Sequence, residues 1–543
     1  MVAQTFHAVP NGRPSLREAY EVWAEHQTPV GDARPQVHPP IDPTTLSVGI
    51  VGGGISGLYA ALLLKAAGAS VHVFEEDPER LGGRVFTYRF DPAPNQYFEA
   101  GAMRLPEIPE QQPVFDLIEH LNGIVPAGHA IETIPYVLFD DAGDLVYVNA
   151  RRGPGENPMS VAYAAAHPDE LGFPAAATGG KPAAALLDDV IGPLLAELQK
   201  DFEKGFAEIV KYDDYSFRSY LSQVKGWSED RINYVEVMTS QTNQFQNSFT
   251  ELVIENMDFS QAAWKTIRNG MDRLPNAMAE VLGRDNITMG ARVVDVRDEA
   301  GRMCVQVEGG ETATFDKVLM ALPPAALRMI RTPTWSAAKT HAIRALHFEP
   351  LYKIGIRFKS RFWEAVSPPA NGGQSITDLP SRWFVYPSYG IGDDGPGVLL
   401  LYTWMTDAVG WLPQDKDERV RLALRDLQTV YGDAVDIQDQ YVEAFDVSWT
   451  ARESTGDAMF VPGQFRNLFN IARQPEGNVY FAGEHLSVHH TWIVGAIDSA
   501  LLACQQMLGQ DDLAPLGHPA ERLAPQRGYD YSTVTRPAEP PSL

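Results

Sequence analysis

The sequence predicts a combined α/β and α+β fold: a parallel-sheet domain built from discontinuous segments, a mixed-sheet domain and a helical insertion. Three observations lead to this prediction. Near residue 50 an apolar run, a glycine-rich turn and a helical run follow one another, as at the start of a parallel βαβ unit. Residues 160–262 show mostly helical periodicity. Strand-like segments rich in aromatic residues occupy 347–405.

The first unit contains the most informative turn. Leu46–Val51 predicts a strand, Gly52-Gly53-Gly54-Ile55-Ser56-Gly57 a tight turn, and Leu58–Ala67 a helix that ends at a glycine. Val71–Phe74 predicts a second strand, which Glu75 closes. A glycine turn alone is weak support for a ligand site, but this strand–turn–helix–strand context is specific.

Each residue type in this unit has a physical role in holding a dinucleotide. Gly52 permits the tight turn, Gly54 lets the backbone approach a pyrophosphate, and Gly57 lets the helix pack close to the strand. The helix N-terminus offers free N–H groups to the phosphates. Glu75 can accept hydrogen bonds from ribose hydroxyls and disfavours a 2′-phosphate. The unit therefore predicts a Rossmann-like dinucleotide-binding domain that does not use NADP.

Two further segments favour FAD over NAD. Gly82-Gly83-Arg84 offers a second close backbone approach and a cation for phosphate, although an ordinary surface turn is the simpler alternative. This arrangement after Glu75 resembles FAD-binding proteins of the flavin amine oxidase superfamily. About 400 residues later, Tyr480–Glu484 ends in Ala-Gly-Glu, which in such flavoproteins places the acid beside the ribityl chain. The resemblance implies a Rossmann-like FAD-binding domain.

The segment Glu99–Pro106 resembles the substrate-carboxylate motif of L-amino acid oxidases. Its Arg104 offers a planar fork that can hold a carboxylate by two hydrogen bonds, and the alternative is a surface arginine before a proline turn. Other segments match the same family, and several are similar to fungal L-lysine oxidase; the matches lie between about residues 47 and 505, at 201–206, 269–275, 377–382, 386–389, 399–404 and 488–493.

The resemblance implies specific roles at the reacting end. Arg104 and Tyr402 bind the substrate carboxylate, Lys353 holds a water near flavin N5, and Trp492 forms a wall of an aromatic cage beside Thr491. The alternatives are a surface lysine on an edge strand and plain core aromatics. The implied FAD contacts are Gly52, Gly54, Ile55, Ser56, Gly57, Glu75, Glu76, Gly83, Arg84, Gly101, Ala102, Met103, Arg104, Val293, Trp449, Gly483, Glu484, Trp492, Ile493 and Ala496.

The implied reaction is FAD-dependent oxidative deamination of an L-amino acid, by hydride transfer from Cα to flavin N5. Oxygen accepts the electrons, and the products are a 2-oxo acid, ammonia and H₂O₂. A flavin amino acid 2-monooxygenase, which forms an amide and CO₂, is the nearest alternative. An amine oxidase is disfavoured because Arg104 needs a carboxylate. A catalytically silent FAD-binding interaction protein is a further alternative.

The side-chain specificity stays open between basic and broad. A basic side chain needs a buried carboxylate, and the candidates are Asp213, Asp214, Glu255, Asp258 and Asp378. Broad specificity is equally compatible with Trp363, Trp383 and Trp404. Animal members of the family carry a histidine in the helical domain, proposed as a base; Leu252–Asp258 has none, and we expect that no side-chain base is needed.

Composition restricts the partners. The net charge of −26 argues against nucleic acid and anionic membranes. Cys304 and Cys504 lie in apolar stretches and predict core residues without a disulfide framework. His489-His490 predicts no metal site, because adjacent side chains on a strand point to opposite faces and no acid is suitably spaced. With no signal peptide or apolar span seen, we expect a cytoplasmic homodimer or higher oligomer that takes an L-amino acid and O₂.

The predicted organisation follows from these segments. Residues 1–45 form an N-terminal arm with a short helix near 15–26, and residues 511–543 form a tail. The FAD-binding domain takes residues 46–110, 263–345 and 440–510. The substrate-binding domain takes residues 111–159 and 346–439, and the helical domain takes residues 160–262.

Overall fold

The computed structural model describes residues 40–241, 243–259, 263–310, 312–450, 455–510 and 513–517. The helix predicted near 15–26 and most of the predicted tail lie outside these residues. The described part combines parallel and mixed sheets with many helices, which confirms the predicted mixed fold class. The domain boundaries stay predictions.

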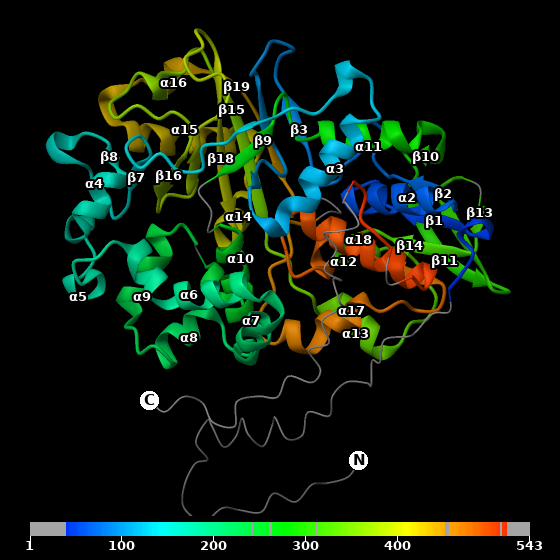
Figure 1. The fold of residues 1–543 in the computed structure, drawn as a ribbon. Coiled ribbons are helices and arrows are strands. Elements are labelled where there is room, and N and C mark those ends of the chain that lie inside the picture. Colours follow the sequence, from blue (N-terminus) through cyan, green and yellow to red (C-terminus); the bar gives the residue numbers. More distant parts are fainter. Residues whose placement is uncertain are drawn as a thin grey trace, which may run out of the picture. The chain divides into compact units, whose positions relative to one another are not determined.

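A five-stranded parallel sheet carries the glycine turn (Figure 1). Segments far apart in the sequence meet in it, in the order β10 (Ile287–Thr288), β2 (Ser70–Phe74), β1 (Ser47–Val51), β14 (Lys317–Met320) and β20 (Val479–Phe481). The helices α2 (Ile55–Ala67) and α18 (Ile493–Leu508) lie side by side against it, one from each end of the described chain.

Local sequence explains why α2 forms directly after the turn. Its aliphatic and small residues are buried on nearly every side up to Leu64, as expected for a helix between a sheet and other helices. Gly68 ends the helix in the left-handed conformation (φ 106°), and its N–H bonds the carbonyls of Leu64 and Lys65. The helix begins at Ile55, three residues earlier than the sequence predicted, so its N-terminus adjoins Gly54.

A second large sheet has seven strands of mixed direction. Its order is β19 (Tyr441–Ser448), β15 (Leu351–Phe358), β18 (Gly397–Trp404), β17 (Trp383–Val385), β16 (Gln374–Thr377), β7 (Leu145–Tyr147) and β8 (Met159–Ser160). Only the β16–β7 pair is parallel. Because β19 pairs with β15, this sheet includes residues up to Ser448. The sequence placed the end of the substrate-binding domain earlier, at residue 439.

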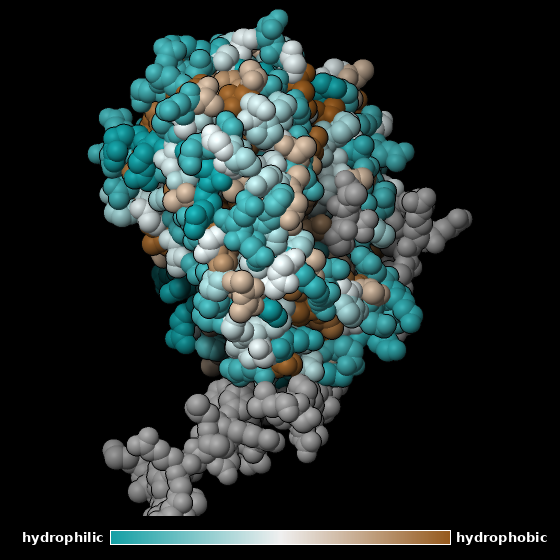
Figure 2. Space-filling model, turned by 90° about the vertical axis from the view of Figure 1, so that its left-hand side faces the viewer, coloured by the Kyte–Doolittle hydropathy of each residue, from teal (hydrophilic) through white to brown (hydrophobic). Residues whose placement is uncertain are grey.

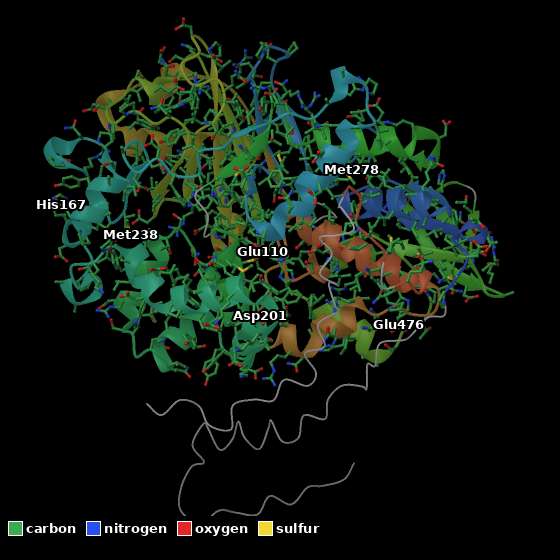
Figure 3. All side chains as sticks on the ribbon, in the orientation of Figure 1. Glu110, His167, Asp201, Met238, Met278 and Glu476 are labelled. Carbon is green, nitrogen blue, oxygen red and sulfur yellow. The ribbon has the colours of Figure 1, made fainter. Side chains whose placement is uncertain are left out.

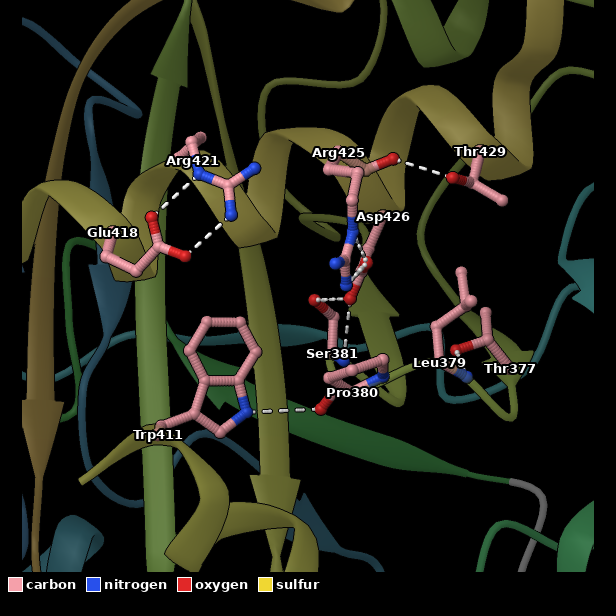
Figure 4. Close-up of polar contacts among 10 residues, drawn as sticks. All are labelled: Thr377, Leu379, Pro380, Ser381, Trp411, Glu418, Arg421, Arg425, Asp426 and Thr429. Atoms are coloured by element: carbon pink, nitrogen blue, oxygen red, sulfur yellow. Dashed lines mark hydrogen bonds and ion pairs between the residues drawn. The ribbon is translucent and has the colours of Figure 1, made fainter. Parts of the chain in front are cut away.

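The turn before β17 is fixed by polar contacts to the helices α14 (Met405–Trp411) and α15 (Lys416–Tyr431), shown in Figure 4. The backbone N–H and hydroxyl of Ser381 donate to Asp426 Oδ2 at 3.1 and 2.8 Å. Trp411 Nε1 donates to the carbonyl of Pro380 at 3.2 Å. These bonds set the start of β17, whose first residue, Trp383, reaches the cavity described below.

Helices fill the segment between β8 and β9, as the periodicity of residues 160–262 predicts. They are α4 (Val161–Ala166), α5 (Ala175–Thr178), α6 (Ala183–Lys200), α7 (Phe202–Ile209), α8 (Phe217–Gln223), α9 (Glu229–Met238) and α10 (Phe249–Asp258). Serine or aspartate side chains cap several of them by accepting an N–H of the first turn, at Ser160, Asp201, Ser216, Ser228 and Ser248. Helix α10 is buried on most of its faces.

Smaller elements complete the described chain. Three-stranded sheets join β11 (Val293–Glu299), β12 (Arg302–Val307) and β13 (Thr312–Phe315), and β5 (Leu105–Pro106), β9 (Trp264–Ile267) and β6 (Thr133–Pro135). The pair β3 (Thr87–Arg89) and β4 (Tyr97–Glu99) stands alone. The remaining α-helices are α3 (Gln112–Asn122), α11 (Arg273–Leu282), α12 (Pro324–Leu327), α13 (Ala337–Ala345), α16 (Ile437–Gln440) and α17 (Asn470–Arg473).

Two sequence expectations concern the surface and the cysteines. Hydrophilic residues cover most of the face seen in Figure 2, and hydrophobic residues form small separate patches there. Within the described ranges no helix is long and apolar enough to cross a bilayer. Cys304 and Cys504 are buried and free, which confirms that they are core residues.

Candidate active site

One large cavity of about 1230 Å³ connects the glycine turn to the mixed sheet. Every predicted site residue lines it except Gly57. A Cβ on Gly57 would lie 2.0 Å from the carbonyl oxygen of Gly52, so this glycine serves the close helix–strand packing predicted for it. The structure thus brings together residues that are up to 444 positions apart, from Gly52 to Ala496. Their individual roles stay predictions.

The glycine turn has the geometry of a phosphate cradle. Gly52 has a φ of 107°, where side chains are disfavoured. A Cβ on Gly54 would meet no atom within 4 Å, so the backbone borders open space at the start of α2. The second glycine pair, Gly82-Gly83, supports the glycine turn, because Gly82 N donates to the carbonyl of Gly53 at 2.9 Å. Open space at a helix N-terminus fits a pyrophosphate.

Glu75 closes β2 beside this cradle. Its Oε2 accepts the N–H of Gly53 at 2.7 Å, and its Oε1 accepts the N–H of Asp77 at 2.8 Å. Burial raises the pKa of this carboxyl, and the two N–H donors oppose that effect. A carboxylate oxygen has more than one acceptor site, so Glu75 can still receive the hydroxyls of a ribose.

Arg84 and Glu484 form an ion pair across 400 positions of sequence, with 2.6 Å between Nη1 and Oε1. Glu484 also accepts the N–H of Ala458 at 3.0 Å and that of Thr491 at 3.1 Å. Burial opposes ionisation of Glu484, but Arg84 together with neighbouring histidines holds its pKa below the usual range. This carboxylate therefore fastens two protein segments, in addition to the ribityl contact that the resemblance implies.

Arg104 lies at the other end of the cavity, where it is 8% exposed. Its guanidinium carbon is 5.0 Å from the ring centre of Phe259, 5.6 Å from Trp383 and 5.8 Å from Trp264. Nη1 donates to Gln374 Oε1 at 3.3 Å. Among the described residues no carboxylate lies within ion-pair distance of it. A buried cation in this state is suited to an anionic ligand.

The register of the mixed sheet places Lys353 beside Tyr402. Residue 353 on β15 pairs with 402 on β18, and 402 pairs with 383 on β17. Lys353 Nζ lies 4.5 Å from the ring centre of Tyr402 and donates to the carbonyl of Gly101 at 2.6 Å. Burial and the nearby Arg104 lower its pKa to about 7. Since β15 is an inner strand and Lys353 is buried, the surface-lysine alternative is wrong.

Trp492 stands in an aromatic group at the same end. Its ring centre is 5.5 Å from Phe259 and 5.9 Å from Trp264, and its Nε1 has no hydrogen-bond partner in the described part of the chain. Trp383 and Trp404 line the cavity as well, with 4.4 Å between their ring centres, whereas Trp363 is packed inside the mixed-sheet core.

Only one of the five acids considered for a basic side chain lines the cavity, and it is Glu255. The others are occupied elsewhere: Asp213 accepts Arg466 N, Asp214 pairs with Arg466, Asp258 pairs with His489, and Asp378 accepts Asn149 N. Glu255 Oε2 is buried without a hydrogen-bond partner in the described ranges. Burial, Glu251 and Asp457 raise its pKa to about 8.

Among the acids that line the cavity, sequence analysis missed two that act on Tyr402, Glu349 and Asp457. Glu349 is 3% exposed and accepts Gln244 Nε2 at 3.1 Å. Burial and Glu484 raise the pKa of Asp457 to about 7, and burial and Asp457 raise that of Glu349 well above its usual range. No periodicity or spacing marks either residue; the only signal was that Glu349 stands four positions before Lys353.

Sequence analysis gave two reasons against a metal site at His489-His490, a strand conformation and the lack of a suitably spaced acid, and both reasons were wrong. The pair lies in the turn that precedes α18, not on a strand, and both rings have acidic partners. His490 Nδ1 lies 2.8 Å from Glu251 Oε2, and His489 Nδ1 lies 3.4 Å from Asp258 Oδ1. These acids come from α10, more than 200 positions away, so sequence spacing could not reveal them. The described residues contain no cluster of three or more side chains suited to a metal.

A parallel sheet with a glycine cradle, joined to a cavity with a buried cation, defines a dinucleotide-dependent enzyme class. The chain belongs to the family of flavin containing amine oxidoreductases, which matches residues 55–171 and 172–508. It is therefore an FAD-dependent oxidoreductase, and the open space beside Gly54 and the acid at the end of β2 fit that cofactor.

Relatives support this assignment. The chain is 34% identical to "Putative bifunctional amine oxidase DDB_G0291301" of Dictyostelium discoideum, over 87% of this chain and 47% of that protein, so it spans about half the relative's length. It is 32% identical to "Putative L-amino-acid oxidase YobN" of Bacillus subtilis, over 83% of this chain and 92% of that one. It is 30% identical to "L-amino-acid oxidase 4" of Hebeloma cylindrosporum, over 86% and 83%.

A solved structure shows the same fold. A putrescine oxidase variant superposes with a TM-score of 0.64 at 20% identity, covering 85% of this chain and 99% of that chain.

Proposed function

We propose that this enzyme oxidises L-α-amino acids with O₂ as the acceptor. The balanced reaction converts the amino acid, O₂ and water into a 2-oxo acid, ammonia and H₂O₂. The observation that carries the proposal is Arg104, a buried guanidinium that faces the cavity without a protein carboxylate in the described ranges. The names of two relatives, "Putative L-amino-acid oxidase YobN" and "L-amino-acid oxidase 4", support it.

Arg104 and Tyr402 bind the substrate carboxylate in this proposal. A planar guanidinium holds a carboxylate by two parallel hydrogen bonds, which fixes the direction of the Cα–H bond. The aromatic rings around Arg104 exclude water and strengthen this attraction. FAD, when bound, would supply the redox chemistry, a two-electron oxidation of the substrate with O₂ as the final acceptor.

Lys353 is suited to hold or move a proton near the reacting atoms. Its ammonium is buried next to Arg104, and its pKa is lowered to about 7. It therefore gains or loses its proton near neutral pH, as efficient acid–base groups do. The hydrogen bond from its Nζ to the carbonyl of Gly101 fixes where that proton lies.

The side-chain end of the cavity favours a cationic group. Glu255, Glu349 and Asp457 line it, and all three exert a charge effect on Tyr402. Their pKa values are raised because they are buried and close to one another. A bound ammonium or guanidinium would relieve this repulsion. We infer that basic L-amino acids are preferred over neutral ones of the same length.

An H₂O₂ assay with the twenty L-amino acids tests the reaction. We expect oxidation of L-amino acids but not of their D-enantiomers, and only slow, measurable oxidation of the amines that lack the carboxylate. Release of CO₂ with an amide product, in place of ammonia and H₂O₂, would identify the monooxygenase instead. Failure of every amino acid to reduce the enzyme without O₂ would refute the proposal.

Matched ligands test the side-chain preference separately. L-Lysine and L-norleucine differ in the terminal ammonium, as do the unreactive ligands 6-aminohexanoate and hexanoate. We expect kcat/KM for lysine and the affinity for 6-aminohexanoate to be roughly 10- to 100-fold higher than for the neutral partners, since hydrogen bonds to charged groups contribute about 1.5–3 kcal/mol. Equal values would refute the preference and leave amino acid oxidation intact.

A further inference from the structure

We propose that His490, held by Glu251, is a positioning residue: it fixes the turn Ser487–Trp492 against α10 and thereby sets where Trp492 faces the reacting end of the cavity. The inference rests on the proposed function, because it concerns the same cavity. No role in the reaction described above uses this histidine.

The pair is buried and closely defined. His490 Nδ1 lies 2.8 Å from Oε2 and 3.0 Å from Oε1 of Glu251, and the two side chains are 1% and 2% exposed. The imidazole is stacked on Phe465, with ring centres 5.3 Å apart and planes 13° apart, and touches Phe460 at 4.2 Å. The backbone N–H of Phe460 donates to Glu251 Oε2 at 2.6 Å. These contacts fix the position and orientation of the His490 imidazole.

Two carboxylates, Glu251 and Glu484, each bond to the same two segments. Glu251 binds Phe460 N and His490, whereas Glu484 binds Ala458 N and Thr491 N. Thr491 has a φ of 71°, an unfavourable conformation for a β-branched residue. Such a conformation persists only where the surroundings enforce it. The Glu251–His490 pair supplies the enforcing contact on the α10 side.

Helix α10 connects this pair to the substrate end. Glu251 and Glu255 share one face of the helix, and the C-cap residue Phe259 follows after another four residues. Glu255 lines the cavity, and the ring of Phe259 lies 5.0 Å from the guanidinium of Arg104 and 5.5 Å from the ring of Trp492. A change at His490 therefore displaces Trp492 relative to Phe259 and to the carboxylate-binding arginine.

Figure 3 draws the side chains of the described residues and labels Met238 and Glu110. Met238 ends α9 and lines the cavity on the helical side. Glu110 contributes to the charged surroundings of the adjacent His489, together with Asp258 and Asp498. His489 pairs with Asp258 through a longer contact of 3.4 Å, so the proposal concerns His490.

The test compares His490→Leu and His490→Asn in the FAD-saturated enzyme. An asparagine Nδ2 can take the place of the imidazole Nδ1 and donate to Glu251, whereas leucine cannot. The first readout is the change in the flavin absorbance spectrum on titration with hexanoate, which gives a Kd without turnover. The second is KM and kcat for an L-amino acid. His129→Leu is the matched control, because His129 pairs with Glu280 at 2.7 Å on the surface.

We expect His490→Leu to raise the Kd of hexanoate and KM by roughly tenfold or more, and His490→Asn to recover most of that loss, since a displaced binding group can lower rates by about 10²-fold. A folded His490→Leu enzyme with a lower melting temperature but Kd, KM and kcat within about twofold of the control would overturn the proposal. So would an asparagine variant as impaired as the leucine one.

If His490→Leu does not fold, Glu251→Ala removes the same hydrogen bond from the α10 side. An unchanged hexanoate Kd in that variant overturns the proposal. Because hexanoate binding needs no reaction, the outcome can be read even if amino acid oxidation is refuted.

Discussion

Replacing Arg104 with methionine separates recognition of the substrate carboxylate from all other contributions of the cavity. The methionine side chain keeps much of the apolar contact with Phe259, Trp383 and Trp264 but removes the charge. Because the guanidinium is buried and has no carboxylate partner in the described ranges, its removal leaves no protein anion unpaired. The folded state should therefore keep its stability.

The magnitude follows from the unpaired substrate carboxylate. Truncating one partner of a buried, hydrogen-bonded charge pair raises the free energy of the complex by about 2–5 kcal/mol. At about 1.36 kcal/mol per tenfold change, kcat/KM for an L-amino acid should fall by roughly 30-fold to several thousand-fold. The same variant should lose nothing with the amine that corresponds to the decarboxylated substrate.

The assay measures H₂O₂ formation with an L-amino acid and with its decarboxylated amine, for wild type and Arg104→Met. Arg361→Met is the control: Arg361 is also buried and lies over an indole, 5.3 Å from Trp363, but it pairs with Glu364 and does not line the cavity. Equal losses for the acid and the amine would refute carboxylate recognition by Arg104.

Three further outcomes are expected. Gly57→Ala should lower the melting temperature even without FAD, because its Cβ would lie 2.0 Å from a carbonyl oxygen. Gly54→Ala should fold normally but lose FAD affinity by about tenfold, because its Cβ enters only the open space beside the turn. Calorimetry measures the first effect and FAD titration the second. Lys353→Met should slow turnover strongly, and unchanged rates in stopped-flow absorbance would contradict its role. The preference for lysine over norleucine should grow from about pH 6 to about pH 8. Over that range Glu255, with its pKa raised to about 8, becomes increasingly ionised, while the lysine ammonium, with a pKa of about 10.4, stays charged. A preference that does not change with pH would count against Glu255.

Local patterns determined how much could be predicted. The strand, turn and helix around Gly52 and the acid Glu75 were found because neighbouring residues define them. Family resemblance located Arg104, Lys353 and Tyr402, which the structure brings to one cavity. Even the side-by-side placement of Lys353 and Tyr402 needed the strand register, which the sequence alone did not provide.

Contacts between distant segments could not be predicted. Glu349 and Asp457 reach the cavity only because a loop before β15 and a loop after β19 meet there. Glu251 pairs with His490 and Asp258 with His489, and each pair is more than 200 positions apart in the sequence. A carboxylate in such a pair has no distinctive neighbours in the sequence, so among 70 acidic residues it cannot be recognised.

The pairing of Arg84 with Glu484 has a consequence for the order of events in biosynthesis. The cradle beside Gly54 is complete in the sequence by residue 84, yet its partner acid and the start of α18 leave the ribosome about 400 residues later. At roughly 5–20 residues per second, the unfinished half-site waits about 20–80 seconds for its other half. The complete site therefore exists only after residue 484 has been made, and until then the early half of the site lacks the acid that pairs with Arg84.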